Sequence, residues 1–270
     1  MKLSHKSFLP GIYNLVKSGS SLDNVDAITT GSVAERQVTI PEGLRINEVA
    51  QLLEKNDILP ASDFLAAARY TPAQVTIPAS YDLKADTFLE GFAFPDTYRL
   101  PADATGEEVV QRMVDNYVEQ TKNLTVSYNT LILASIVEKE AKYDEDRAVI
   151  ASVFTNRLSL GMPLQSNPTV AYAKANANCG SKSLDTCVQM SWWPIPVTAD
   201  FTSLVSQYNT YLVKGLPPRP ICNPGIKSIE AAVNPAKTDY LYFITDASGH
   251  AHFAKTLAEH NANIAQYMGK

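Results

Sequence analysis

A glutamate at the end of an apolar helical stripe is the side chain in this sequence best placed for acid–base chemistry. Positions i, i+3, i+4 and i+7 of one helical face are occupied by Leu133, Ile136, Val137 and Glu140. A carboxyl group on an apolar wall has its charged form disfavoured, so its pKa rises and it can donate a proton near neutral pH. The pattern makes Glu140 a candidate general acid, whereas Glu138 points to the other side of the helix. The alternative is that Glu140 lies at the rim of the stripe, with its carboxylate in water.

Other kinds of reactive site have weaker support in the sequence. His250 and His252 share one face of an expected strand, but two histidines without a third ligand nearby are weak evidence for zinc. We interpret them as a polar strand face. The sequence has no glycine-rich phosphate loop and no GxSxG nucleophile motif.

Composition places the chain among ordinary globular proteins. Its 270 residues are 45% apolar and 19% charged, which allows one large domain or two smaller ones. The net charge of −5 argues against nucleic-acid binding, which requires a basic surface. Cys179 and Cys187 flank a short polar loop that a disulfide could close, the alternative being two free thiols, and Cys222 is expected to be a buried small hydrophobe.

Helices with clear boundary signals are expected on both sides of the Glu140 segment. Thr105 and Glu108 form a capping box before an amphipathic helix, and Asp144 can cap the helix that follows Glu140. Near the C-terminus, residues 239–246 and 250–256 alternate like the two arms of a hairpin. A closing helix then begins at residue 256 or 257.

Residues 36–78 are expected to form a small strand–helix–helix–strand unit. The first strand is RQVTIPEG, the first helix is INEVAQLLEKN, Ser62 caps the second helix, and residues 74–78 (QVTIP) form the return strand. A unit of this size and order resembles a LysM-like subdomain. The alternative is an α+β adaptor without affinity for glycans.

Four separated blocks of the sequence resemble one family. They are IVEKEA with DRAVIASVFTNRL and GMPLQSNPTV, LEGFAFPDTYRL (Leu89–Leu100), YNTYLVKGLPPRPICNPG (Tyr208–Gly225) and NPAKTDYLYFITDASGHAHFAKTLAEHN (Asn234–Asn261). In the same order, these blocks are similar to the YceG-like family of endolytic murein transglycosylases. The resemblance implies that the second glutamate of the EKE motif, Glu140, is the catalytic acid, and that no metal or cofactor is needed.

The resemblance also implies a mechanism with a single carboxyl group. Glycoside hydrolases use two, about 5–5.5 Å or 6.5–9.5 Å apart. A lytic transglycosylase protonates the leaving oxygen and then takes the proton of the C6 hydroxyl of N-acetylmuramic acid (MurNAc), which attacks C1 and closes a 1,6-anhydro ring. Such an enzyme needs neutral polar groups that orient the sugar and stabilise oxocarbenium-like charge.

The matching blocks supply candidate groups of this kind. Aromatic rings suit the apolar faces of sugars, and amides can bind hydroxyl and N-acetyl groups. The substrate-binding candidates are Gln165, Ser166, Asn167, Thr169, Tyr208, Asn209, Thr210, Tyr211 and Glu90. For each of them the alternative is a structural hydrogen bond that holds a loop. Asp96 is expected to stabilise a turn.

These observations predict an α+β protein, with a mainly helical catalytic domain over residues 81–270 and a small β element. Residues 33–80 would be the LysM-like subdomain, and residues 1–32 the remnant of a related module. The substrate would be the bond from MurNAc to N-acetylglucosamine (GlcNAc) in murein glycan strands. The alternatives are a non-catalytic glycan-binding scaffold, and a hydrolase that pairs Glu140 with Asp96 or Glu90.

The resemblance further implies a place in the cell. Family members carry an N-terminal membrane anchor, and no apolar segment of this sequence is long enough to be one. We therefore expect an ectodomain that works at the outer face of the cytoplasmic membrane, with cell-wall synthases as partners.

Overall fold

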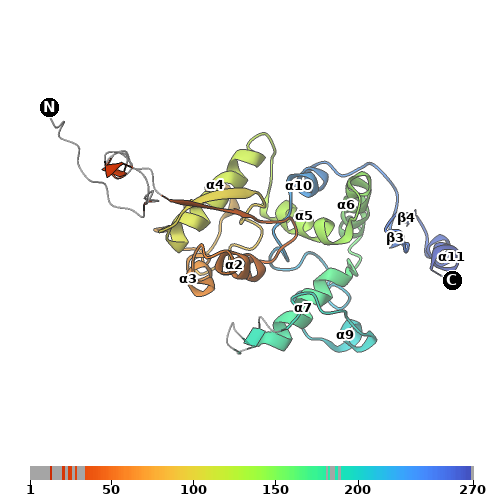
Figure 1. The fold of residues 1–270 in the computed structure, drawn as a ribbon. Helices are drawn as coiled ribbons and strands as arrows, with labels where there is room; N and C mark the ends of the chain where they lie inside the picture. Colours follow the sequence, from red (N-terminus) through yellow and green to blue (C-terminus); the bar gives the residue numbers. More distant parts are fainter. Residues whose placement is uncertain are drawn as a thin grey trace.

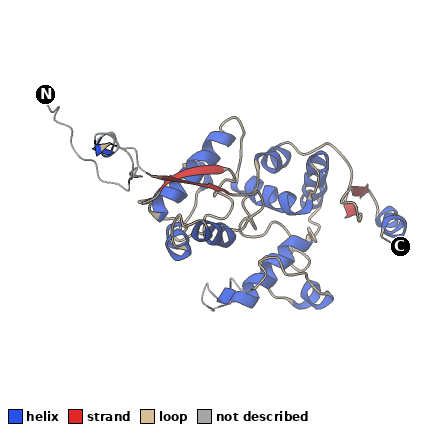
Figure 2. Ribbon diagram, viewed as in Figure 1, coloured by secondary structure: helices blue, strands red, loops and turns tan. Residues whose placement is uncertain are grey.

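The computed structural model describes residues 34–180, 182, 186–187 and 190–268, together with residues 13, 20, 21, 24, 25 and 28. This part of the chain is mainly helical and contains two small antiparallel sheets (Figure 2), which confirms the expected α+β class. The fold expected for residues 1–32 lies almost entirely outside the described residues.

A two-stranded sheet and three helices form the N-terminal part of the described fold. Strand β1 (Glu35–Thr39) pairs with β2 (Thr97–Pro101). Helix α2 (Ile46–Lys55) packs on α3 (Ala61–Ala67), and α3 packs on α4 (Gly106–Thr121) (Figure 1). The predicted capping box before α4 is confirmed, because the Thr105 hydroxyl accepts from the Glu108 amide while the Glu108 carboxylate accepts from the Thr105 amide.

The expected return strand over residues 74–78 is wrong. The partner of β1 is β2, and residues 75–78 form an irregular segment before the short 3-10 helix η1 (Ala79–Tyr81). Val75 and Ile77 are buried on the inner side, which explains their strand-like alternation. The backbone amide between them, that of Thr76, donates to the Gln111 side chain at 2.7 Å instead of to a neighbouring strand.

The expected caps of two other helices are also wrong. Helix α3 follows Pro60, so Ser62 lies inside its first turn. Helix α6 (Asp144–Ser159) has Tyr143 at its cap position, and Asp144 is its first residue. In this first turn the Asp144 carboxylate lies near the positive end of the helix dipole.

A buried helix positions Glu140. Helix α5 (Tyr128–Glu140) packs against α6 and α10 (Ile226–Val233), and all of its residues from 131 to 137 are buried. Its apolar surface is therefore wider than the expected stripe, because helices cover it on more than one side. Glu140 is the last residue of α5, where the buried part of the helix meets the cavity described below.

Helices α7 (Asn167–Cys179) and α9 (Thr198–Ser203) form a lobe beside this helical body (Figure 1). A disulfide joins Cys179 at the end of α7 to Cys187, as the sequence suggested. Cys222 is a buried free thiol, which confirms its prediction. The disulfide ties Cys187 to the C-terminal end of α7.

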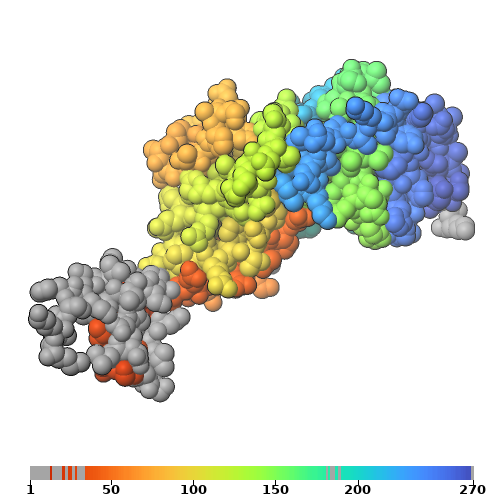
Figure 3. Space-filling view, turned by 90° about the horizontal axis from the view of Figure 1, so that it is seen from above, coloured from red at the N-terminus to blue at the C-terminus, as the bar shows by residue number. Residues whose placement is uncertain are grey.

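The C-terminal elements lie at the end of the described molecule opposite α2 to α4 (Figure 3). Strands β3 (Tyr242–Thr245) and β4 (Ala251–Ala254) form the predicted hairpin. Helix α11 (Leu257–Tyr267) packs on both strands, and Thr256 caps it. The expected hairpin and closing helix are thus confirmed.

The division of the chain at residues 32 and 80 stays a prediction, as does the LysM-like character of the N-terminal unit. The β1–β2 pairing does cross residue 80, since β2 begins at Thr97. Within the described ranges, no helix is both long enough and apolar enough to cross a bilayer.

Candidate active site

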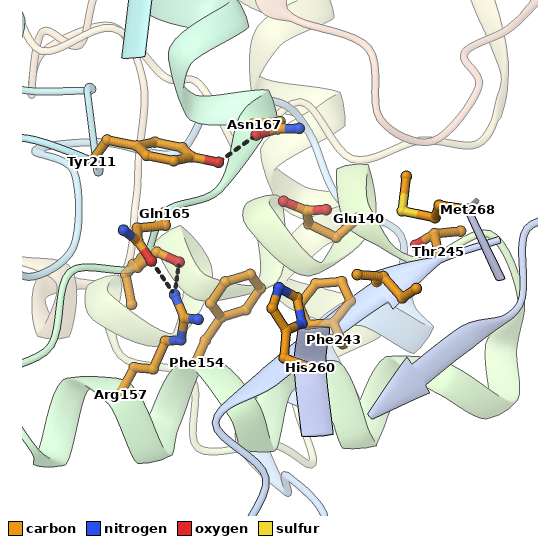
Figure 4. A pocket seen from close by; sticks show the side chains of 12 residues that line it. Glu140, Phe154, Arg157, Gln165, Asn167, Tyr211, Phe243, Thr245, His260 and Met268 are labelled. Carbon is orange, nitrogen blue, oxygen red and sulfur yellow. Dashed lines mark hydrogen bonds between the residues drawn. The ribbon is translucent and has the colours of Figure 1, made fainter. Parts of the chain in front are cut away.

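Glu140 faces a cavity of about 530 Å³ between the helical body and the C-terminal hairpin (Figure 4). Seven segments contribute to its wall: the end of α5, α6, the loop before α7, the first residue of α7, the YNTY motif, β3, and α11 with the residue that follows it. The residues that line it are Glu140, Phe154, Arg157, Leu164, Gln165, Asn167, Tyr211, Phe243, Ile244, Thr245, His260 and Met268. Among these lining residues Glu140 carries the only carboxyl group.

Burial keeps the Glu140 carboxyl group protonated to an unusually high pH. Loss of water raises its pKa to about 7, while a hydrogen bond from Ser166 and the positive charge of Arg157 oppose this rise. The Ser166 hydroxyl donates to Oε1 of Glu140 at 2.6 Å. Since the pKa lies near neutral pH, the group can both give and take a proton there.

Arg157 interacts electrostatically with this carboxyl group and donates hydrogen bonds to the loop that precedes α7. Its side chain donates to the backbone oxygens of Leu241 at 2.6 Å and Leu164 at 2.9 Å, and to Oε1 of Gln165 at 3.2 Å. The guanidinium group is thus held by neutral acceptors and forms no ion pair among the described residues. Its charge stabilises the Glu140 carboxylate once the proton has left.

Gln165 has a strained backbone at the edge of the cavity. Its φ angle is +52°, in the left-handed region that residues other than glycine rarely adopt. Two contacts hold this conformation: the Gln165 amide donates to the Thr210 carbonyl at 3.0 Å, and the Arg157 guanidinium binds its side chain. This backbone conformation places the Gln165 side chain at the cavity and the hydroxyl group of the next residue, Ser166, at Glu140.

Asn167 and Tyr211 form the opposite wall. The Tyr211 hydroxyl donates to Oδ1 of Asn167 at 2.6 Å, and Figure 4 shows both side chains on the side of the cavity that the Glu140 carboxyl group faces. Of the nine substrate-binding candidates, the structure brings Gln165, Asn167 and Tyr211 into the cavity wall and Ser166 into contact with Glu140.

Three candidates are buried behind this wall. Thr169, Asn209 and Thr210 have at most 1% of their surface exposed. The Thr210 hydroxyl lies 2.8 Å from that of Thr169 and accepts from the Ser166 amide at 3.0 Å. The Asn209 amide group donates to the backbone oxygens of Asp200 and Leu204, both at 2.9 Å. These contacts hold the loops in position, so the structure favours the structural alternative for all three.

Tyr208 and Glu90 lie together, but in a different cavity from Glu140. Both line a second cavity of about 310 Å³ with Arg45, Tyr172 and Trp192. Glu90 is 2% exposed, and its burial raises its pKa to about 7. The Glu90 carboxylate accepts from the Ile46 amide at 2.7 Å and from the Asn223 side chain at 3.3 Å.

Several other charged candidates also lie away from the Glu140 cavity. Asp96 accepts from the Thr97 amide at 2.7 Å, in agreement with its expected role in a turn. Glu138 points away from Glu140 as expected, but its side chain is only 7% exposed and lies 3.4 Å from the Arg147 guanidinium. His250 stacks on Tyr143, and no cluster of three metal-binding side chains occurs within the described ranges.

Two titratable residues of the cavity wall were not among the site residues predicted from the sequence, Arg157 and His260. Arg157 follows Phe154 by three positions on an apolar helix face, which is the same signal that identified Glu140. His260 reaches the cavity from α11, and burial together with the charge of Arg157 lowers the pKa of its ring. Its Nδ1 is buried without a hydrogen-bond partner among the described residues. No local sequence pattern around His260 predicts that its side chain lines the cavity.

Comparison with known proteins identifies the family. Residues 1–266 match the YceG-like family. The chain belongs to this family. An endolytic murein transglycosylase of Bacillus subtilis is 33% identical over 97% of this chain and 73% of its own length. One of Streptococcus pneumoniae strain R6 is 32% identical over 96% of this chain, which spans half the length of that relative.

A solved structure of the same family shares the fold. The crystal structure of a YceG-like protein from Listeria monocytogenes superposes with a TM-score of 0.67 at 32% sequence identity. The match covers 90% of this chain and 81% of the Listeria chain. The resemblance deduced from the four sequence blocks is therefore confirmed at the level of the family.

Proposed function

We propose that this chain is an endolytic lytic transglycosylase of murein, in which Glu140 is both the acid and the base. The observation that carries the proposal is a lone carboxyl group, with a pKa of about 7, facing a cavity whose other polar wall groups include neutral amides and a phenol. The names of the two relatives, both endolytic murein transglycosylases, support the same activity.

The first step is proton donation from Glu140 to the glycosidic oxygen between MurNAc and GlcNAc. The bond from C1 of MurNAc to this oxygen breaks, its electron pair stays on the oxygen, and GlcNAc leaves with a 4-hydroxyl group. Glu140 is now a carboxylate beside the positive charge that develops at C1. Ser166 and Arg157 stabilise this carboxylate, which makes the proton easier to release.

The second step closes the ring. The Glu140 carboxylate takes the proton of the C6 hydroxyl of MurNAc, and the freed electron pair of O6 forms the new bond to C1. The products are a 1,6-anhydro end and a free 4-hydroxyl, and Glu140 is protonated again. No water is consumed, so no second carboxyl group is needed to activate one. Gln165, Asn167 and Tyr211 would orient the sugar in this cavity.

The two rival functions have less support. A two-carboxylate hydrolase would need Asp96 or Glu90 beside Glu140, and neither residue lines the Glu140 cavity. A non-catalytic scaffold would have no use for a protonated carboxyl group facing an open cavity. We further propose that the protein works in the cell envelope, at the outer face of the cytoplasmic membrane and near cell-wall synthases.

Incubation with purified sacculi tests the proposed function. The chain should release soluble fragments longer than disaccharides, because an endolytic enzyme cuts inside strands. Glu140→Gln should release none at the same protein concentration. Arg99→Gln, a substitution at an exposed position of β2 outside both cavities, is the matched control and should act like the unaltered chain. Release of disaccharides alone, or equal release by Glu140→Gln, contradicts the proposal.

A further inference from the structure

The second cavity contains a buried arginine that forms no ion pair among the described residues. Arg45 is 2% exposed and lies at the start of α2. Its guanidinium group donates to the Trp192 carbonyl at 3.2 Å and to the Asn176 side chain, and it lies 3.9 Å from the centre of the Tyr172 ring. Its Nε has no partner within the described part of the chain, and none of the ion pairs found there involves Arg45.

A second guanidinium group lines the same cavity. Arg219 is half-buried, and within the described ranges it forms no hydrogen bond or ion pair. Its positive charge opposes the burial that raises the pKa of Tyr172 and Tyr208, so it lies within electrostatic reach of both hydroxyl groups. The cavity therefore holds two cationic groups with free donor capacity.

Glu90 lines this cavity and Glu48 lies beside it, and neither forms an ion pair with a guanidinium group among the described residues, although the positive charge of Arg45 opposes the burial that raises the pKa of Glu90. Glu90 accepts from the Ile46 amide and the Asn223 side chain, and its pKa of about 7 leaves it partly neutral at physiological pH. Glu48 accepts from the Arg45 backbone amide at 2.9 Å and from the Trp193 indole at 3.0 Å. Two guanidinium groups thus share a cavity whose only lining carboxyl group is partly neutral, and because a buried cation without a counter-ion is costly, the cavity favours a further anionic group.

The two cavities share parts of their walls. On α7, Asn167 lines the Glu140 cavity and Tyr172 lines the second one, about 7.5 Å further along the helix axis at 1.5 Å per residue. In the YNTY motif, Tyr211 lines the first and Tyr208 the second. Helix α7 and the YNTY motif therefore each contribute a side chain to both cavities.

We propose that the second cavity is a carboxylate-binding subsite for the peptide stems of the glycan strand, with Arg45 and Arg219 as the groups that bind the carboxylate. This inference rests on the proposed function, because it takes murein as the substrate. A peptide stem suits the cavity better than a bare sugar does. The stem carries carboxylates that the two guanidinium groups can bind, whereas a neutral sugar would add no negative charge to the cavity.

Intrinsic fluorescence provides a binding assay that does not depend on cleavage. Both tryptophans of the chain belong to this region: Trp192 lines the cavity, and Trp193 binds Glu48 beside Arg45. The probe is the disaccharide GlcNAc–MurNAc carrying a peptide stem, which has no MurNAc–GlcNAc bond to cut. The same disaccharide without the peptide is the control ligand. We expect the peptide-bearing disaccharide to change the fluorescence at a much lower concentration.

Arg219→Gln tests the subsite, and Arg99→Gln removes the same charge from an exposed strand position away from it. Loss of a charge-assisted hydrogen bond should raise the Kd of the peptide-bearing disaccharide about tenfold or more in Arg219→Gln. Arg99→Gln should leave that Kd unchanged. In cleavage assays, Arg219→Gln should raise KM for strands with stems and leave KM for amidase-stripped strands unaltered.

The possible outcomes separate this inference from the proposed function. Equal binding of both disaccharides, or equal behaviour of Arg219→Gln and Arg99→Gln, overturns the subsite even when strands are cut. If no strand is cut but the peptide-bearing disaccharide binds through Arg219, the subsite stands and the proposed activity fails.

Discussion

The half-buried Glu140 and the buried Glu90 both have pKa values raised to about 7, yet their carboxyl groups meet different surroundings. Glu140 receives one hydrogen bond from the described residues, that of Ser166, and faces a cavity of about 530 Å³. Glu90 joins the start of α2 to the Asn223 loop through the Ile46 amide and the Asn223 side chain. A raised pKa alone therefore does not identify a proton donor.

The difference between these two residues lies in the room left for a substrate. A general acid needs an oxygen that can approach the leaving group. In Glu140 only Oε1 has a hydrogen-bond partner among the described residues, so Oε2 remains available. Both oxygens of Glu90 have partners, since the Tyr172 hydroxyl lies 3.5 Å from Oε2. On this comparison we propose Glu140 for the chemistry and Glu90 for the support of the second cavity.

The largest expected effect comes from Glu140→Gln. The amide keeps the shape of the side chain but has no proton to donate, so kcat for strand cleavage should fall by about 10²–10⁴-fold or more. The melting temperature measured at pH 6 should stay within a few degrees of that of the unaltered chain, because below its pKa the carboxyl group is largely neutral, as the amide is. Initial rates and a thermal melt measure the two quantities. Retained kcat would remove Glu140 from the mechanism.

Glu90→Gln sharpens the comparison, since it makes the same chemical change in the other cavity. Its kcat should stay within about threefold of the original, because Gln can still accept from the Ile46 amide and no proton transfer is lost. KM is free to change, as the cavity belongs to the proposed subsite. A drop in kcat as large as that of Glu140→Gln would mean that the two cavities act in one chemical step.

Glu138→Gln changes stability instead of chemistry. Glu138 lies 3.4 Å from Arg147 and accepts from the Gly225 amide at 3.1 Å, with both ion-pair side chains less than 10% exposed. Removing its charge weakens the hold on a buried arginine, so the free energy of unfolding should fall by about 1–3 kcal/mol. Urea titration measures this loss, and kcat at a temperature where the variant is folded should be nearly unchanged. Loss of kcat without loss of stability would contradict this role.

The smallest expected effect is a shift of the pH profile in Ser166→Ala. With a folded pKa of about 7, Glu140 is protonated and active below that pH, and activity should fall as pH rises through about 7. The Ser166 hydrogen bond favours the carboxylate, so its removal raises the pKa and moves this alkaline limb to higher pH. The rate below the limb should change by about tenfold or less. An unmoved limb, or a movement to lower pH, would show that the limb does not report Glu140.

How much the sequence could predict depends on the range of the interactions. Glu140 could be found because helical periodicity is local, and so could the Thr105 capping box and the C-terminal hairpin. The partner of β1 could not, since Val38 pairs with Tyr98 across sixty positions and no local signal specifies that register. The alternation at Val75 and Ile77 reflects burial in an irregular segment, which periodicity does not distinguish from a strand.

The same limit applies to the candidate site. The sequence indicated which loops carry polar groups, but not which side chains face outward. Thr210 accepts a hydrogen bond from the amide of Ser166, which is 44 positions away in the sequence. Its hydroxyl group therefore supports the Ser166 loop and does not line the cavity. Tyr208 and Tyr211 belong to one motif but line different cavities, because the chain turns between them. Periodicity places Arg157 on the same apolar helix face as Phe154, but it does not distinguish an arginine that faces a cavity from one whose guanidinium group reaches solvent.

Cleavage of glycan strands in oxygen-18 water tests the central claim most directly. If the C6 hydroxyl attacks C1 with Glu140 as the only acid and base, the new MurNAc ends are 1,6-anhydro rings. Mass spectrometry should then find these ends one water lighter than reducing ends and free of the heavy isotope. Reducing ends that carry oxygen-18 would show that water attacks C1, and the account of Glu140 as a single-carboxyl lyase would be wrong.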